Sequence, residues 1–321
     1  MAVAGGLPGK VSVQTITQHP SDPTTIYIGT DDGLWRSSDG GDSWEKPDFP
    51  DRGAVIWSIA FHPTRPEILY AGAAPVVLYR SEDGGDSWTR MPQAQSPGHC
   101  ERDGFDTRTI SFTFHPTRPD ELYMGIEVGG VLHSTDAGET WTDVSASLMK
   151  LAEQPHLQNN VGGRHCGLCE GMLDTHALAI TTAEPGAAFL GLRMGIFRTD
   201  DGGASWYDTE VGRFSPLTYC RDLIVSPHDP NVLYTALSGA AVSTEGSLYR
   251  SDDAAQTWNR IDHGVEAQST IVNLAAHPTD PASLYSITRA GKVIGTEDDG
   301  ESWQEFPLPE GVHDVYAVAC L

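Results

Sequence analysis

The chain has 321 residues and a formal net charge of −24, because 44 acidic residues outnumber 20 lysines and arginines. A surface this acidic repels phosphate backbones and anionic lipids, so we expect neither nucleic acid nor a membrane surface as a partner. We also expect no signal peptide in the first ten residues and no bilayer-spanning segment, because no apolar run has the required length. The odd count of five cysteines argues against a disulfide scaffold and favours a cytoplasmic location.

Apolar runs of strand length recur along the chain in sets that end in one octet. The first set is Val11–Gln18, Ile26–Gly29 and Leu34–Arg36, followed by the octet Ser37–Trp44. Five further sets open with the runs Val55–Phe61, Thr109–Phe114, Ala177–Thr182, Asp222–Val225 and Ile271–Ala276. Short strands separated by Gly- and Pro-rich turns, without a long helical pattern, predict an all-β fold. A last apolar run, Val315–Cys320, has no partner strands after it.

The octet has the pattern Ser/Thr-x-Asp-x-Gly-x-Ser/Thr-Trp. Its six copies begin at residues 37, 81, 134, 199, 251 and 296, so they are 44, 53, 65, 52 and 45 residues apart. The pattern suits a tight turn in which Asp accepts hydrogen bonds from backbone N–H groups, Gly adopts a positive φ and Trp packs into an apolar seam. The fifth copy has Ala255 at the Gly position, so we expect a strained or differently shaped turn there. This period is typical of a propeller blade.

The octet is the Asp-box, and the chain resembles the BNR/Asp-box β-propellers, which include sialidases, tandem-propeller xyloglucanases, sortilin-type receptors and photosystem assembly factors. The resemblance covers nearly the whole chain and implies one domain over residues 1–321. We expect a six-bladed β-propeller in which 315–320 closes the ring against the first blade. An incomplete seven-bladed propeller is the alternative. Because the Asp-box is a fold element found with unrelated activities, function has to be inferred from the loops.

The four strands of each repeat, A to D, alternate in direction, so the D–A and B–C loops share the face opposite the Asp-boxes. Three D–A loops are long, at residues 92–108, 145–176 and 211–221. Long loops without strand pattern in a compact domain are commonly functional. We therefore expect a pocket on this face, over the central channel.

Arginines and possible acid–base groups gather in these loops. The arginines expected to bind an anion are Arg52, Arg108, Arg164, Arg193, Arg221 and Arg289. The candidate catalytic groups are Asp106, Asp174, His176, Tyr219 and Asp222. A guanidinium grips carboxylate, sulfate or phosphate with two hydrogen bonds, and two carboxylates at a suitable separation can hydrolyse a glycoside. The alternative is a structural network in which the arginines pair with loop acids such as Glu127 and Asp174.

The resemblance to sialidases implies an arginine triad and a Tyr–Glu nucleophile pair. Tyr219 with Glu127 or Glu170, together with Arg108, Arg193 and Arg221, is a partial match. The Arg-Ile-Pro segment expected near the N-terminus of those enzymes is absent.

Four cysteines lie in three successive D–A loops, and the segment from His165 to Cys169 contains a Cys-x-x-Cys, a spacing found in zinc and redox sites. A structural zinc held by Cys100, His165, Cys166 and Cys169 is one interpretation. Reduced bystander thiols, a disulfide or a catalytic thiol are the others. We expect no other cofactor.

These features favour a hydrolase acting on a small anionic or carbohydrate-like ligand. In that reading Arg108, Arg193 and Arg221 bind the anion, and the candidate acids and His176 transfer protons. The alternative is a non-catalytic propeller that binds a protein or peptide partner, as an assembly or scaffold factor.

Overall fold

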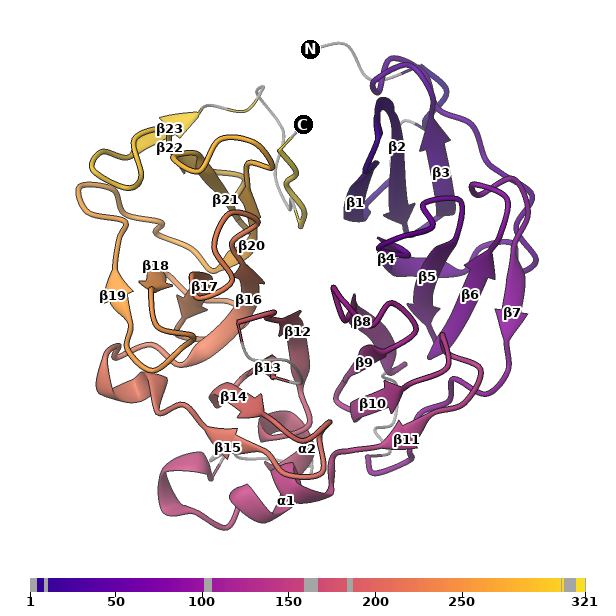
Figure 1. Cartoon of the computed structure of the whole chain (residues 1–321). Coiled ribbons are helices and arrows are strands. Elements are labelled where there is room, and N and C mark those ends of the chain that lie inside the picture. Colours follow the sequence, from indigo (N-terminus) through magenta and orange to yellow (C-terminus); the bar gives the residue numbers. More distant parts are fainter. Residues whose placement is uncertain are drawn as a thin grey trace.

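The computed structural model describes residues 5–8, 11–100, 106–158, 167–183, 187–306, 308 and 316–320. These residues form six antiparallel sheets arranged in a ring (Figure 1). The predicted six-bladed β-propeller is therefore confirmed. Within the described ranges, no helix is both long and apolar enough to cross a membrane.

Each sheet is a meander of consecutive strands, with the first strand nearest the central channel. The sheets are β1 Val13–His19, β2 Asp22–Thr30 and β3 Gly33–Ser37; β4 Val55–Phe61, β5 Leu69–Ala74, β6 Val77–Ser81 and β7 Thr89–Met91; β8 Arg108–Phe114, β9 Leu122–Glu127, β10 Gly130–Ser134 and β11 Thr142–Asp143; β12 Thr175–Ile180, β13 Ala188–Leu192, β14 Gly195–Thr199 and β15 Tyr207–Asp208; β16 Tyr219–Val225, β17 Leu233–Ser238, β18 Gly246–Ser251 and β19 Asn259–Arg260; β20 Ile271–Ala276, β21 Leu284–Thr288, β22 Val293–Thr296 and β23 Gln304–Phe306. The core lies between neighbouring sheets, where their apolar faces pack together.

The short helices lie in two of the long D–A loops. Helix α1 covers Ala146–Leu151, the 3-10 turn η1 covers Pro155–Leu157, α2 covers Gly167–Gly171 and η2 covers Val211–Arg213. These loops are thus partly ordered by helical turns, which the strand-like pattern of the rest of the sequence did not indicate.

The first blade and the ring closure differ from the expectation. The first sheet has three strands, and its outer position is reduced to one bridge between Arg36 and Glu45. Residues 316–320 lie between β1 and β20 (Figure 1) without forming a strand there. They are held by hydrogen bonds from Val318 N to Asn273 Oδ1 and from Cys320 Sγ to Ala275 O. The C-terminal segment therefore fills the seam between the sixth and first blades through side-chain bonds and packing.

The Asp-box turns are built as expected. Asp39 Oδ1 accepts hydrogen bonds from Ser43 N and from Ser37 Oγ, each at 2.8 Å. Hydrogen bonds from Ser43, first from its hydroxyl and then from its backbone N–H, hold the pKa of Asp39 at about 2. Gly41 has a φ of 96°. Ala255, at the same position in the fifth copy, keeps a positive φ of 69°, so that turn retains its shape and places an alanine in a strained conformation.

The Tyr-x-Gly at the second strand of a blade joins it to the next blade. The Tyr70 hydroxyl donates to the carbonyl of Ala137 in the following Asp-box, at 2.9 Å. A Cβ on Gly72 would lie 2.5 Å from both Ser58 Oγ and the Thr109 side chain. The glycine is required because the next blade packs against its Cα.

A β-bulge near the start of each first strand positions one side chain at the channel. In β12, Thr175 pairs with Leu192 and Ala177 with Gly191, so His176 is the extra residue. The extra residues of the six blades, in chain order, are Gln14, Trp57, Ile110, His176, Arg221 and Val272. All six line one channel cavity of about 290 Å³. Bulges of this kind redirect a side chain and are common beside functional sites.

Candidate functional site

A second cavity of about 280 Å³ shares several of its walls with the channel cavity, and we call it the mouth cavity. Its walls include Arg108, Arg221 and Arg289, the aromatic side chains of Trp57, Tyr219 and Tyr316, and Glu127. These residues come from the second, third, fifth and sixth blades and from the C-terminal segment. The predicted pocket on the D–A face therefore exists as a cavity.

The structure brings some of the predicted arginines together and separates others. Arg108, Arg221 and Arg289 line the mouth cavity, and Arg193 lies beside it in the turn between β13 and β14. Arg52 lies in a separate cavity beside β3, together with Asp32 and Lys46. Arg164 lies outside the described residues.

Glu127 is the carboxylate that two of these arginines share. Arg108 pairs with Glu127 across the β8–β9 ladder, and their side chains form an ion pair. Arg221 Nη1 lies 3.8 Å from Glu127 Oε1. The guanidinium carbon of Arg108 lies 4.0 Å from the ring centroid of Trp57, a cation–π contact. Glu127 therefore orders two cations of the cavity wall.

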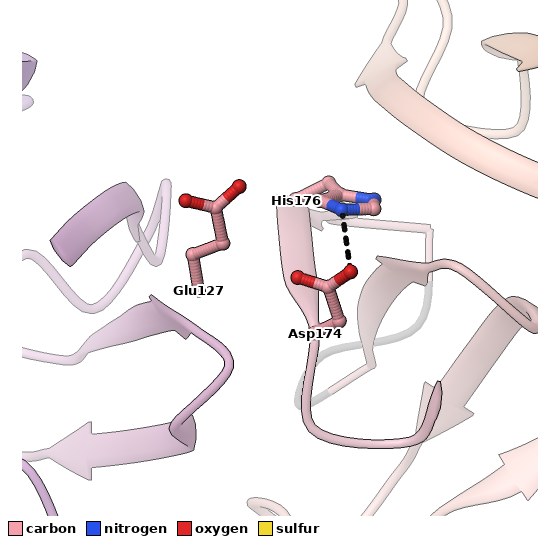
Figure 2. A group of neighbouring side chains, drawn as sticks. All are labelled: Glu127, Asp174 and His176. Carbon is pink, nitrogen blue, oxygen red and sulfur yellow. Dashed lines mark ion pairs between the residues drawn. The ribbon is translucent and has the colours of Figure 1, made fainter. Parts of the chain in front are cut away.

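A second group of side chains surrounds His176. Figure 2 shows Glu127 facing Asp174 and His176 from the neighbouring blade. His176 Nδ1 lies 2.8 Å from the carbonyl oxygen of Cys220, so Nδ1 carries a proton and donates it. Its Nε2 lies 3.2 Å from the Tyr219 hydroxyl and 3.4 Å from Asp174 Oδ2. Only 4 % of Tyr219 is exposed, and the His176 side chain is fully buried.

Arg193 completes this group. One of its nitrogens, Nη2, lies 3.3 Å from Asp174 Oδ2 and 3.3 Å from Glu170 Oε2. Its guanidinium carbon lies 5.4 Å from the centroid of the Tyr219 ring. The cation thus contacts two buried carboxylates and the aromatic ring.

Burial and charge act differently on the two titratable groups beside His176. Burial alone would raise the pKa of Asp174, but His176, Arg193 and Arg221 together bring that pKa below its ordinary value. Burial raises the pKa of Tyr219 to about 12. At neutral pH the carboxyl group is therefore ionised, and the hydroxyl keeps its proton until a base removes it.

Two other predicted catalytic residues lie away from this group. Asp222 lines the channel cavity, where its carboxylate accepts hydrogen bonds from Leu223 N, Leu274 N and Asn273 Nδ2. These bonds join the fifth blade to the sixth, and burial raises the pKa of Asp222 to about 6. Asp106 is exposed two residues before β8 and is not among the residues that line either cavity.

The predicted zinc site requires a correction. Cys100 and Cys169 form a disulfide, with their Cα atoms 5.8 Å apart, so their sulfurs cannot act together as thiolate ligands. His165 and Cys166 lie outside the described residues. Disulfides persist in oxidising compartments and are reduced in the cytoplasm. The cytoplasmic location stays a prediction, and this disulfide argues against it.

Glu127, Asp174 and His176 offer ligand atoms that all lie within 4.8 Å of one another. Arg108 and Arg221 contact Glu127, while Arg193 contacts Asp174. These guanidinium groups already neutralise the carboxylates and would repel a cation. The arrangement therefore suits an anion better than a metal ion.

Sequence reasoning missed Trp57, Gln14 and Tyr316 as site residues. Two of them, Gln14 and Trp57, stand at the bulge position of the first strand in their blades. Glu127 and Glu170 were expected as alternatives for a Tyr–Glu pair with Tyr219, and Glu127 also as a partner of arginine, whereas the structure pairs Glu127 with Arg108 and Glu170 with Arg193.

Comparisons with known proteins identify relatives of this fold. The Sortilin-Vps10 family model (sortilin, neurotensin receptor 3) matches residues 246–319. Xyloglucanase Xgh74A of Acetivibrio thermocellus is 30% identical over 276 residues, which are 81% of this chain and 26% of that protein. The chain thus spans about a quarter of this relative's length.

Solved structures resemble the whole chain at low identity. The GH74 enzyme of Niastella koreensis superposes with a TM-score of 0.70 and 16% identity, covering 99% of this chain and 50% of that chain. YCF48 bound to D1 peptide superposes with a TM-score of 0.59 and 16% identity, and the match covers 93% of this chain and 83% of the YCF48 chain. Six Asp-boxes, six sheets in a ring and these matches show that the chain is similar to the BNR/Vps10-like β-propellers, with no specific member singled out.

Proposed function

We propose that this chain is a hydrolase-type propeller that binds a small anionic or glycosidic substrate in the mouth cavity. The observation that carries the proposal is the meeting of three guanidinium groups, Arg108, Arg221 and Arg289, with the buried hydroxyl of Tyr219 in the wall of one cavity. Arginines bind the acid group of a substrate, and a tyrosine with a neighbouring base supplies a nucleophile.

The charges of the cavity wall favour an anion. Arg108 and Arg221 share the single carboxylate of Glu127. Arg289 donates from Nη1 to the carbonyl of Ala241 at 3.2 Å and has no carboxylate partner within the described ranges. Three cations and one carboxylate leave the wall positive inside a protein of net charge −24. Such a local field attracts anions, which the remaining surface repels.

The proposed chemistry uses the group around His176. His176 Nδ1 faces the carbonyl of Cys220, so Nε2, when it carries no proton, can accept the proton of the Tyr219 hydroxyl as that oxygen attacks the substrate. The ionised carboxylate of Asp174 stabilises the imidazolium that forms. The Tyr219 oxygen bonds to the sugar carbon as the glycosidic bond breaks, and the imidazolium returns the proton to the leaving-group oxygen. Water then breaks the sugar–tyrosine bond, its hydroxyl going to the sugar and its remaining proton to the Tyr219 oxygen.

Similarity to glycoside hydrolases supports this proposal at the level of the fold. Xgh74A is a xyloglucanase and the Niastella koreensis protein is a GH74 enzyme, and this chain is similar to a part of each. The chain is also similar to YCF48 bound to D1 peptide, and it covers 83% of that chain. That similarity favours a second candidate, a non-catalytic propeller whose arginines hold a carboxylate of a peptide partner.

The test is a panel of 4-nitrophenyl glycosides with and without a carboxylate on the sugar. We expect turnover of the acid-bearing members, and Tyr219→Phe should lower kcat by about 100-fold or more. Tyr207→Phe is the matched control, because Tyr207 is 43% exposed on the outer strand of the same blade as His176. Failure of the whole panel, together with retention of a carboxylate-terminated peptide that Arg289→Ala releases, would favour the binding candidate.

A further inference from the structure

The Cys100–Cys169 disulfide joins two D–A loops that lie 69 residues apart in the chain. Cys100 belongs to the loop before β8, and Cys169 lies in α2 before β12. Both cysteines are buried, in a small apolar cluster with Val128 and Leu173. The bond therefore ties the third blade's entry loop to the fourth blade's entry loop.

Three residues of the site follow the disulfide within seven positions. Glu170 comes directly after Cys169, and Asp174 and His176 follow in the same segment. Helix α2 has only five residues, so its own hydrogen bonds cannot stabilise it. The position of Glu170 thus depends on tertiary contacts, and the disulfide is the covalent one.

Glu170 in turn controls Arg193. The Glu170 carboxylate and the Asp174 carboxylate each lie 3.3 Å from the same Arg193 nitrogen, and the side chains of both acids are at least nine-tenths buried. Arg193 lies over the Tyr219 ring. Without Glu170 at this place, Arg193 has one carboxylate partner fewer to hold it over the ring.

We propose that Glu170 is a positioning residue for Arg193 and Tyr219, and that the Cys100–Cys169 disulfide holds it in place. Reduction of the disulfide by a dithiol then loosens this arrangement. In that step the S–S bond breaks and takes up two electrons and two protons, giving two thiols, while the dithiol is oxidised to its own disulfide. The placement stands on contacts alone, whereas its effect on turnover rests on the proposed function.

Amide hydrogen exchange of the segment 167–176 tests the placement without any substrate. We expect about tenfold faster exchange in the dithiol-reduced protein and in the variant Cys100→Ser/Cys169→Ser than in the oxidised protein. Cys320→Ser is the matched control, because Cys320 is a free cysteine in the C-terminal segment. Equal exchange in the oxidised protein and the double variant would overturn the proposal.

Kinetics of Glu170→Gln test the positioning role. We expect kcat to fall by about tenfold with KM nearly unchanged, Glu170→Asp to restore part of the loss, and dithiol reduction to reproduce it. Glu153→Gln, an exposed acid after α1, should have no effect. Turnover that is insensitive to Glu170→Gln overturns the proposal. Faster exchange in a protein that hydrolyses nothing contradicts the proposed function and leaves the placement intact.

Discussion

The Asp-box face of the ring and the opposite face differ in how strictly they repeat. On the Asp-box face, the same hydrogen bonds recur from blade to blade, as between Asp39 and Ser43 and between Asp83 and Ser87. On the opposite face, the six bulge positions carry six different residue types. The repeated face fixes the geometry of the ring, and the variable face uses that geometry to collect side chains from distant parts of the chain.

The ion pairs of the two faces also differ, in how deeply they are buried. On the Asp-box face, Arg80 reaches Glu139 of the next blade, and the carboxylate is 65% exposed. On the variable face, Arg193 contacts Asp174, whose side chain is 5% exposed. Exposed pairs contribute little to stability, whereas breaking a buried pair leaves an uncompensated charge. The same pair of residue types, an arginine and an acid, therefore contributes differently to stability on the two faces.

The largest expected effect concerns Asp222 on the variable face. Its pKa of about 6 lies above the ordinary 3.8, so the folded state retains a proton that the unfolded chain releases. This stabilisation is full below about pH 4 and is lost as the pH rises to about 6, amounting to about 3 kcal/mol. Denaturant unfolding of the wild type and of Asp222→Asn should be measured between those pH values. The free energy of unfolding of the wild type should fall relative to that of the variant as the pH rises. Parallel stability curves for the two proteins would contradict the assignment.

A smaller effect is expected where blades meet. Gly72→Ala should lower the free energy of unfolding by about 2 kcal/mol, because the new Cβ overlaps Ser58 and Thr109 of the adjoining strands. The reverse change, Ala236→Gly at the equivalent position of the fifth blade, should cost only about 1 kcal/mol. Thermal or denaturant unfolding measures both. Equal losses would mean that the close approach of the blades is not what requires glycine.

The smallest effect is expected on the Asp-box face. Arg80→Met keeps the apolar stem and removes the ion pair with Glu139, so unfolding should become easier by less than about 1 kcal/mol. The difference should disappear in about 1 M salt, where exposed pairs are screened. A loss that persists in salt would indicate that the pair behaves as a buried one.

The sequence predicted the repeated parts of the fold well. The expected strand Val55–Phe61 coincides with β4, and the Asp-box positions and the count of blades agree with the structure. These features follow from local hydrogen bonding and from a period, which a single sequence contains. The missing fourth strand of the first blade was not predictable, because a Trp after an Asp-box is compatible with both a strand and a single bridge.

The site was predicted in its residue types but not in its contacts. Arg108, Arg221 and Arg289 were expected in one pocket, whereas Arg52 was expected with them and lies elsewhere. Loop position alone does not distinguish the two cases, since the outcome depends on how far each side chain lies from the ring axis. The disulfide was one interpretation among several, because pairing of Cys100 with Cys169 needs the distance between two loops.

The measurement that tests the central claim most directly is calorimetric titration of the protein with D-glucuronate and with D-glucose, which differ by one carboxylate. We expect at least about tenfold tighter binding of glucuronate, because it alone engages the cation-lined wall. Arg289→Ala should remove this preference, and Arg52→Ala, in the separate cavity, should leave it unchanged. Equal binding of the two sugars by the wild-type protein, or the same loss in both variants, would contradict an anion site at the mouth of the channel.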